Sequence, residues 1–261
     1  MERVVRGGWR RGLRERAAAR NPLAGRPALR RPWCMAHPYW PLFDLRVTTP
    51  RVELRLPGDD DLVELARVAA GGVHDAGAMP FSIPWTDAPS PQLERSSLQW
   101  WWRQRAEWSP ASWSWAGAVF FEGRPVGVQD LAAKDFAQTR TVKTGSWLGA
   151  PFQGQGLGKE MRAAVLHLAF AGLGAAEAYS GAWHDNAASL GVSRALGYVD
   201  NGTEILLRRA KPDRMVNLRL DRAAWEIVRR DDITVTGLDG CLEMFGVSTP
   251  PRPPLPGREA S

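Results

Sequence analysis

Apolar and polar residues in the first part of the chain alternate with two different periods. Residues 51–56 alternate with a period of two, which predicts a half-buried strand. Three aspartates at 59–61 offer helix caps, and apolar residues at 62, 65, 68 and 69 recur at helical spacing. Residues 71–90 carry several Gly and Pro and predict a long loop, after which 91–108 predict a second helix.

The rest of the pattern predicts a mixed α/β domain with an antiparallel meander at its centre. We expect strands over residues 113–121, 124–132, 141–148 and 177–180, from 198 onward and over 215–220. Helices are expected over 156–172, between the third and fourth of these strands, over 186–196, after the fourth, and over about 222–229, at the end. This order departs from the strict β-α-β-α alternation of a doubly wound sheet.

Composition separates one body from two atypical ends. Residues 1–34 contain ten Arg and two Glu, a net charge of +8, whereas the whole chain of 261 residues carries +6. We expect 1–36 to be a disordered or wrongly assigned extension, with a functional basic arm as the alternative. The Pro-rich stretch 248–261 predicts a disordered tail, so residues 37–247 are expected to form one domain.

The body shows no sign of several common function classes. It has no apolar run of about 18 residues, so no membrane span is expected. Its near-neutral charge argues against a nucleic-acid partner. Four His show no metal-ligand spacing, so no metal is expected, and Cys34 and Cys241 lie far apart, which is typical of a reduced cytoplasmic protein.

The segment 145–158, GSWLGAPFQGQGLG, carries the strongest chemical signal. Its glycines allow close approach to the backbone, and the first N–H groups of the predicted helix favour an anion such as a diphosphate. A P-loop is excluded because Gln153 replaces its first Gly and Glu160 its hydroxyl residue. The dinucleotide fingerprint fails because Lys159 follows the glycines. The spacing that fits is Q-x-x-G-x-G, at Gln153, Gly156 and Gly158.

At these residues the sequence resembles the GNAT superfamily of N-acyltransferases. A second segment resembles the RimJ/RimL-like branch, the ribosomal-protein N-terminal acetyltransferases, at Asn186, Ser189, Val192, Leu196, Gly197 and Tyr198. The resemblance covers about residues 45–225. It implies a single α/β (α+β mixed) domain whose central, mostly antiparallel twisted sheet is splayed at the fourth strand and flanked by helices.

The resemblance also implies acetyl-CoA, or another acyl-CoA, as co-substrate. Backbone groups near Trp147 and Leu148 would hold the pantetheine arm and polarise the thioester, and Asn186 would contact that arm. The diphosphate would bind to backbone N–H groups of the remaining implied residues, Gln153, Gly154, Gln155, Gly156, Leu157, Gly158 and Lys159.

The acid and the base are less well defined. Many GNAT enzymes have a tyrosine where this chain has Ser193, so Ser189 is the candidate acid, with close packing as its alternative role. The base stays open between Asp130, which we favour because it lies near a strand end next to the cofactor strand, and these residues of the loops: His74, Asp75, Asp135, His184 and Asp185.

We therefore expect an N-acetyltransferase that modifies a primary amine of a protein or small molecule. Two alternatives stay open: a succinyl-CoA-type enzyme, in which Arg140 or an Arg of the substrate loops pairs with the acyl carboxylate, and a non-catalytic acyl-CoA sensor. Trp100, Trp101 and Trp102 cannot share one helical face. We expect core packing for some of them, with a substrate groove or a homodimer contact open for the others.

Overall fold

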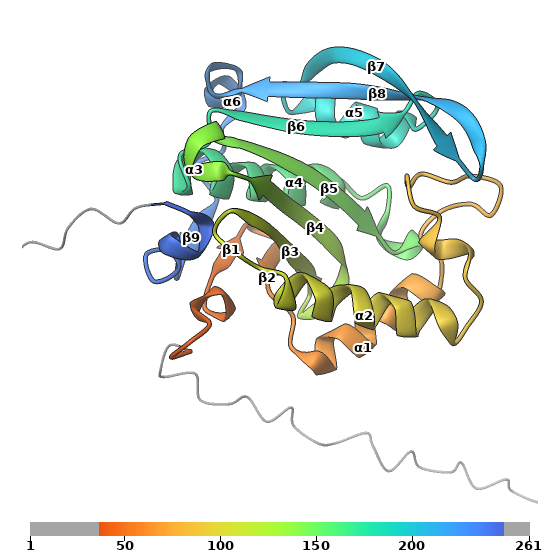
Figure 1. Ribbon diagram of the computed structural model, residues 1–261, viewed down its shortest axis with the longest axis horizontal. Helices are drawn as coiled ribbons and strands as arrows, with labels where there is room; N and C mark the ends of the chain where they lie inside the picture. The colour runs from red at the N-terminus through yellow and green to blue at the C-terminus, as the bar shows by residue number, and fades with distance from the viewer. Residues whose placement is uncertain (1–36, 248–261) are drawn as a thin grey trace, which may run out of the picture. The chain divides into compact units, whose positions relative to one another are not determined.

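A computed structural model describes residues 37–247, which form one unit around a sheet of 9 strands (Figure 1). Residues 1–36 and 248–261, for which an extension and a tail are expected, lie outside the described residues. Along the sheet the strand order is β7-β8-β6-β5-β4-β3-β2-β1-β9. The strands are β1 Arg46–Thr48, β2 Val52–Arg55, β3 Ser112–Phe121, β4 Arg124–Lys134, β5 Thr141–Leu148, β6 Glu177–Trp183, β7 Val199–Arg208, β8 Lys211–Asp221 and β9 Thr234–Thr236.

Helices cover both faces of this sheet. Leu62 and Leu65 of α1 and Trp101 of α2 pack with apolar side chains of β3 and β4 in a small core. The larger core lies on the opposite face, where α4 buries residues such as Met161 and Val165. The helices are α1 Asp59–Ala70, α2 Gln92–Ala106, α3 Phe136–Thr139, α4 Leu157–His167, α5 Ala187–Ala195 and α6 Arg222–Val228, with a π-helical turn at Leu168–Gly172 and short 3-10 turns at Pro41–Phe43, Trp85–Asp87, Ala150–Phe152 and Leu242–Phe245.

The central meander confirms the predicted hairpin. Glu122 and Gly123 both have positive φ, 50° and 77°, and they close a two-residue turn in which Phe121 pairs with Arg124. Two positive φ angles match the right-handed twist of the flanking strands. Strands β3, β4 and β5 therefore follow one another in the chain and in the sheet.

One junction of the sheet is open, as the resemblance implied. β5 pairs with β4 from Lys143 to Leu148, but it pairs with β6, in parallel, only from Thr141 to Lys143. Beyond Lys143 the two strands diverge, while β6 continues to Trp183 along β8. This wedge between β5 and β6 leaves one edge of β5 unpaired over residues 144–148, so backbone groups there can bind a ligand.

The structure corrects several element boundaries. β6 and β8 are longer than the predicted 177–180 and 215–220, and β1, β9 and α3 are additional. The three aspartates occupy the first turn of α1 rather than its cap, which is Gly58. As expected, the three tryptophans of α2 do not share a face: Trp101 is buried, whereas Trp100 and Trp102 are 38% and 49% exposed.

Candidate functional site

The turn before α4 forms a cradle of free backbone donors. Gly154 and Gly156 have φ of 72° and 80°, a region that other residues adopt only with strain. Among residues 37–247, the N–H groups of 154–158 donate to no hydrogen-bond acceptor. They lie at the N-terminus of α4, where the helix dipole favours negative charge. We call residues 154–158 the cradle; its donors and open glycines fit a diphosphate.

The side chain of Gln153 anchors the cradle to its surroundings. Its Nε2 donates to the carbonyl of Val73 and to that of Leu148, both at 2.8 Å. The first bond ties the cradle to the loop after α1, and the second ties it to the end of β5. The motif glutamine is thus engaged with the backbone on both sides, and it fixes where the cradle begins.

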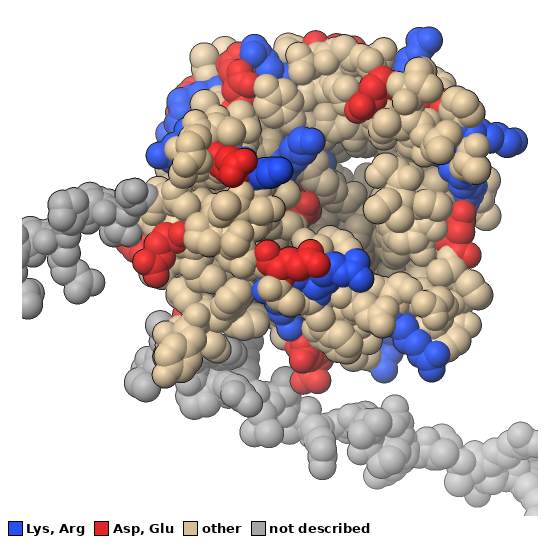
Figure 2. All heavy atoms as spheres, in the orientation of Figure 1, with Lys and Arg blue, Asp and Glu red and all other residues tan. Residues whose placement is uncertain are grey.

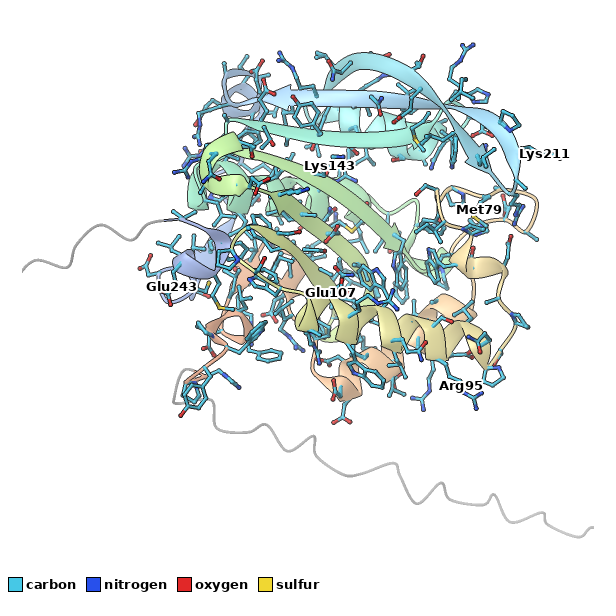
Figure 3. The ribbon with its side chains drawn as sticks, viewed as in Figure 1. Met79, Arg95, Glu107, Lys143, Lys211 and Glu243 are labelled. Carbon is cyan, nitrogen blue, oxygen red and sulfur yellow. The ribbon has the colours of Figure 1, made fainter. Side chains whose placement is uncertain are left out.

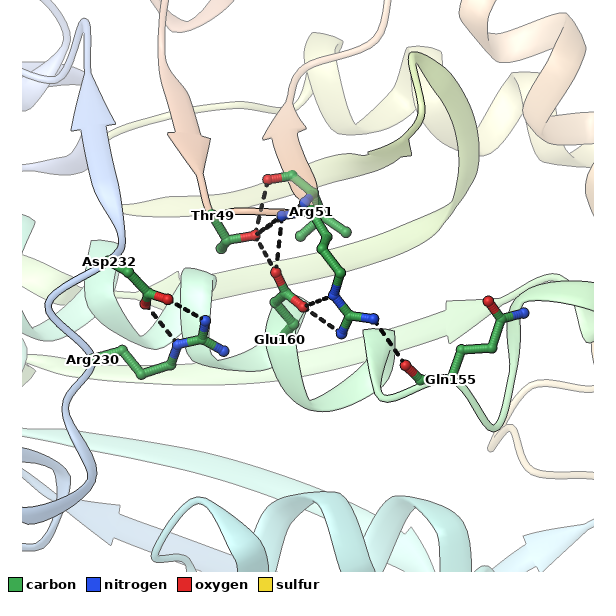
Figure 4. A network of polar contacts seen from close by, with 7 residues as sticks. Thr49, Arg51, Gln155, Glu160, Arg230 and Asp232 are labelled. Carbon is green, nitrogen blue, oxygen red and sulfur yellow. Dashed lines mark hydrogen bonds and ion pairs between the residues drawn. The ribbon is translucent and has the colours of Figure 1, made fainter.

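An ion pair between the buried Glu160 and the exposed Arg51 supports the cradle (Figure 4). Glu160, 4% exposed, accepts from Thr49 Oγ1 at 2.6 Å and from Arg51 Nε at 2.6 Å. Arg51 Nη1 also donates to the carbonyl of Gln155 at 3.0 Å. Burial alone would raise the pKa of Glu160, but the hydrogen bonds from Thr49 and Arg51 outweigh it and lower the pKa. Sequence reasoning missed Arg51 and Glu160 because they meet across 109 residues.

Figure 2 shows an opening through the molecular surface in the region of the wedge between β5 and β6. On the α4 side, the wedge ends in buried polar groups. Arg162 of α4 donates to Ser146 of β5 and to Ser180 of β6, at 3.0 and 3.2 Å. Thr144 Oγ1 lies 3.1 Å from the hydroxyl of Tyr198, and burial raises the pKa of that hydroxyl. Tyr198, the last residue of the second motif, is therefore buried and hydrogen-bonded.

Asp130 lies on the other side of the sheet, in the middle of β4 rather than at its end. It pairs with Gly145 of β5, and its carboxylate accepts from Ser114 Oγ at 2.5 Å. Burial raises its pKa to about 6. A Cβ built on Gly145 would meet no heavy atom within 4 Å, so there is open space beside the carboxylate.

A cavity of about 540 Å³ opens on this same side of the sheet. Lys134, Lys143 and Tyr179 line its strand side, and Glu107, just after α2, lines the opposite side. Lys143 and Glu107 are marked in Figure 3, on β5 and beside α2 respectively. Ser114 also lines the cavity, and because its hydroxyl donates to Asp130, the cavity lies next to that carboxylate.

Helix α5 brings the second predicted segment to the cradle. The Oδ1 of Asn186 caps this helix by accepting from the backbone N–H of Ser189 at 3.1 Å. Val192 of the same helix packs against Gly158: its Cγ2 lies 3.7 Å from the position that a Cβ on Gly158 would take. Ser189 is partly exposed, whereas Ser193 is fully buried and its Oγ has no partner in the described structure.

Three of the other candidate bases, His74, His184 and Asp185, have partners of their own. His74 contacts Thr86 Oγ1 at 2.7 Å and the carbonyl of Asp75 at 2.8 Å. His184 pairs with Asp213 at 3.2 Å. Three carboxylates remain. Asp185 pairs with Arg208 at 2.9 Å, whereas Asp75 and Asp135 are exposed, the latter just before the short helix α3. None of these contacts involves Asp130.

Comparison with known proteins agrees with this fold. A profile of the acetyltransferase (GNAT) domain matches residues 51–199. The chain also resembles a solved structure of RimL, a ribosomal L7/L12 alpha-N-protein acetyltransferase in complex with coenzyme A. The identity is 16% and the TM-score 0.55, over 67% of this chain and 97% of that chain. It likewise resembles Mycobacterium smegmatis RimJ in complex with CoA-disulfide, with 15% identity and a TM-score of 0.58, over 72% of this chain and 95% of that chain. At such identities these likenesses show the fold.

The described residues contain neither a candidate membrane span nor a candidate metal site. No helix within 37–247 is long and apolar enough to cross a membrane. In the same residues, no group of three or more His, Cys, Asp or Glu side chains is arranged to hold a metal ion.

Proposed function

The chain belongs to the GNAT acetyltransferase family, and on that premise we propose that it transfers an acyl group from a CoA thioester to a primary amine. Acetyl is the simplest such group. The observation that carries the proposal is the cradle, whose unpaired N–H groups lie next to the unpaired edge of β5. A diphosphate in the cradle and an extended arm along β5 would satisfy both sets of backbone groups.

The residues of this chain fit the parts of an acyl-CoA. The cradle would hold the diphosphate. The backbone N–H groups of Gln153 and Lys159, also expected to bind it, instead donate to the carbonyls of Ala150 and Gly156, so Lys159 would contribute only its ammonium group. The free edge of β5 at Trp147 and Leu148 would hold the arm, and the amide nitrogen of Asn186 is available because only its oxygen caps α5. The thioester would then lie in the wedge, where backbone donors can polarise its carbonyl.

The amine would approach from the opposite side, through the 540 Å³ cavity. Its nitrogen attacks the thioester carbon, so the C–N bond forms as the C–S bond breaks. The ammonium proton must leave, and we assign its acceptance to Asp130, directly or through water. A carboxylate with a pKa of about 6 is a better base than an ordinary aspartate and is still ionised above neutrality.

The departing thiolate gains from a proton donor. We assign this role to Ser189, whose hydroxyl is partly exposed on the first turn of α5. Ser193 is fully buried and does not reach the surface.

The test is turnover by the full chain. Acetyl-CoA is mixed with each of three amines: a peptide with a free N-terminus, an N-blocked peptide containing lysine, and spermidine. Free thiol is then measured. Thiol release that depends on one of these amines supports the proposal. Tight binding of acyl-CoA without turnover on any amine would instead indicate a sensor that has kept the fold.

A further inference from the structure

Arg162 is a buried cation without an anionic partner. Arg162 is 3% exposed, and no carboxylate within 37–247 forms an ion pair with its guanidinium. Its hydrogen bonds go to the neutral oxygens of Gln129, Ser146 and Ser180, at 3.2, 3.0 and 3.2 Å. Glu160 of the same helix, which is also buried, is by contrast paired with Arg51.

An unbalanced buried charge is costly, so its retention calls for an explanation. Removing a guanidinium from water costs several kcal/mol unless an anion and hydrogen bonds replace the water. Three neutral acceptors satisfy only part of its five N–H donors and none of its charge. The charge would be compensated if an anion entered the site during function.

The position of Arg162 identifies where that anion would come from. The guanidinium bridges Ser146 of β5 and Ser180 of β6, just beyond the last paired residues, Lys143 and Tyr179. It therefore lies at the narrow end of the wedge. Arg162 is five residues into α4 from Leu157, or about 8 Å along the helix from the cradle. An arm that leaves the cradle along β5 points its acyl end towards this guanidinium.

We propose that the acyl group itself carries a terminal carboxylate, as in succinyl-CoA, and that Arg162 binds this carboxylate. The inference rests on the proposed function and narrows its donor. A diphosphate would be held in the cradle, and an acidic acceptor on the cavity side would meet Lys134 and Lys143 first. Arg162 faces the α4 side, which leaves the acyl end of the donor as the anion nearest to it.

The chemistry is the same amide-forming step. The amine attacks the thioester carbon, CoA leaves as the thiolate, and the distal carboxylate stays bound to Arg162 throughout. A modified lysine would change from a cation to an anion. Arg140, the arginine expected in this role from the sequence, instead lies over the ring of Phe136 at 5.5 Å and donates to the carbonyl of Leu173.

Three CoA esters titrated into the full chain test the inference. Succinyl-CoA and butyryl-CoA have acyl chains of equal length and differ in the carboxylate, and acetyl-CoA reports binding of the shared CoA moiety. We expect succinyl-CoA to bind about tenfold or more tightly than butyryl-CoA, the range typical of a hydrogen-bonded charge pair. Arg162→Met should abolish this preference and leave acetyl-CoA binding intact, and Arg162→Lys should keep part of it.

Arg222→Met is the matched control, because Arg222 donates to the carbonyls of Phe170 and Ala175, outside the wedge. It should leave the succinyl preference unchanged. Equal affinities for succinyl- and butyryl-CoA in the unmodified chain would overturn the inference, whether or not the variants fold, and would leave the proposed function standing. Failure to bind any of the three esters would instead overturn the proposed function.

Discussion

The ion pair beneath the cradle should contribute measurably to both stability and ligand binding. In Glu160→Gln the side chain keeps its shape but loses its charge. The carboxylate is 5% exposed and accepts from Thr49 and Arg51, whereas the Arg51 side chain is 45% exposed. Removing one partner of a fully buried pair costs about 3–5 kcal/mol. Because Arg51 can regain water, we expect a loss of about 2–3 kcal/mol in the free energy of unfolding.

Thermal unfolding of the full chain measures this loss. For a domain of this size, about 2–3 kcal/mol corresponds to a melting temperature lower by roughly 4–12 °C. The control is Glu226→Gln, since Glu226 is 46% exposed and pairs on the surface with Arg222 and Arg229. Such surface pairs contribute about 0–1 kcal/mol.

The same variant should weaken ligand binding, because Arg51 also holds the carbonyl of Gln155 in the cradle. The effect should depend on pH. The folded-state pKa of Glu160 is lowered, so its contribution to stability is present above the unfolded-state value and is lost as pH falls towards the folded value. Equal melting temperatures for Glu160→Gln and Glu226→Gln at neutral pH would refute this reasoning.

Two further predictions concern the chemical step. Asp130→Asn should lower kcat/KM by about 10²-fold or more and remove the rise in rate as pH increases through about 6, which pH profiles of both proteins would detect. Because the folded-state pKa of Asp130 is raised, its charged form destabilises the fold as pH increases through 6. Asp130→Asn should therefore raise the free energy of unfolding at pH 8 by about 1–3 kcal/mol and melt at a higher temperature; a lower melting temperature would contradict the burial argument. Ser189→Ala should lower kcat about tenfold with little change in acyl-CoA affinity, and an unchanged kcat would assign Ser189 to packing alone.

Local patterns in the sequence were enough to predict the fold class and the position of the cradle. The hairpin, the three-strand meander and the glycine turn before α4 each depend on a few neighbouring residues, and the structure contains all three. The short strands β1 and β9 were not predicted, because three residues are too few to establish a period of apolar positions. Their pairing with each other is a long-range effect.

The parts of the candidate site that could not be predicted depend on contacts between distant segments. Arg51 meets Glu160 only when β2 packs beside α4, and Arg162 meets Ser146 and Ser180 only at the point where two strands separate. Asp130 was expected near a strand end because the predicted strand stopped at 132. The strand continues to Lys134, so Asp130 is partly buried, which explains its raised pKa.

The central claim is that the cradle binds the diphosphate of an acyl-CoA. The most direct test is calorimetric titration of the full chain and of Gly156→Glu with acetyl-CoA, with succinyl-CoA and, as a diphosphate-containing control, with NADH. Gly202→Glu on β7 is the matched control variant, since Gly202 also has a positive φ, 86°. We expect both CoA esters to bind the unmodified chain and Gly202→Glu, and NADH to bind neither. Gly156→Glu should bind the esters at least about a hundredfold more weakly, because it places a carboxylate among the anion-binding donors, at a strained positive φ and with its Cβ 3.4 Å from Arg51 Nη2. Undiminished CoA ester binding by a folded Gly156→Glu variant would contradict it.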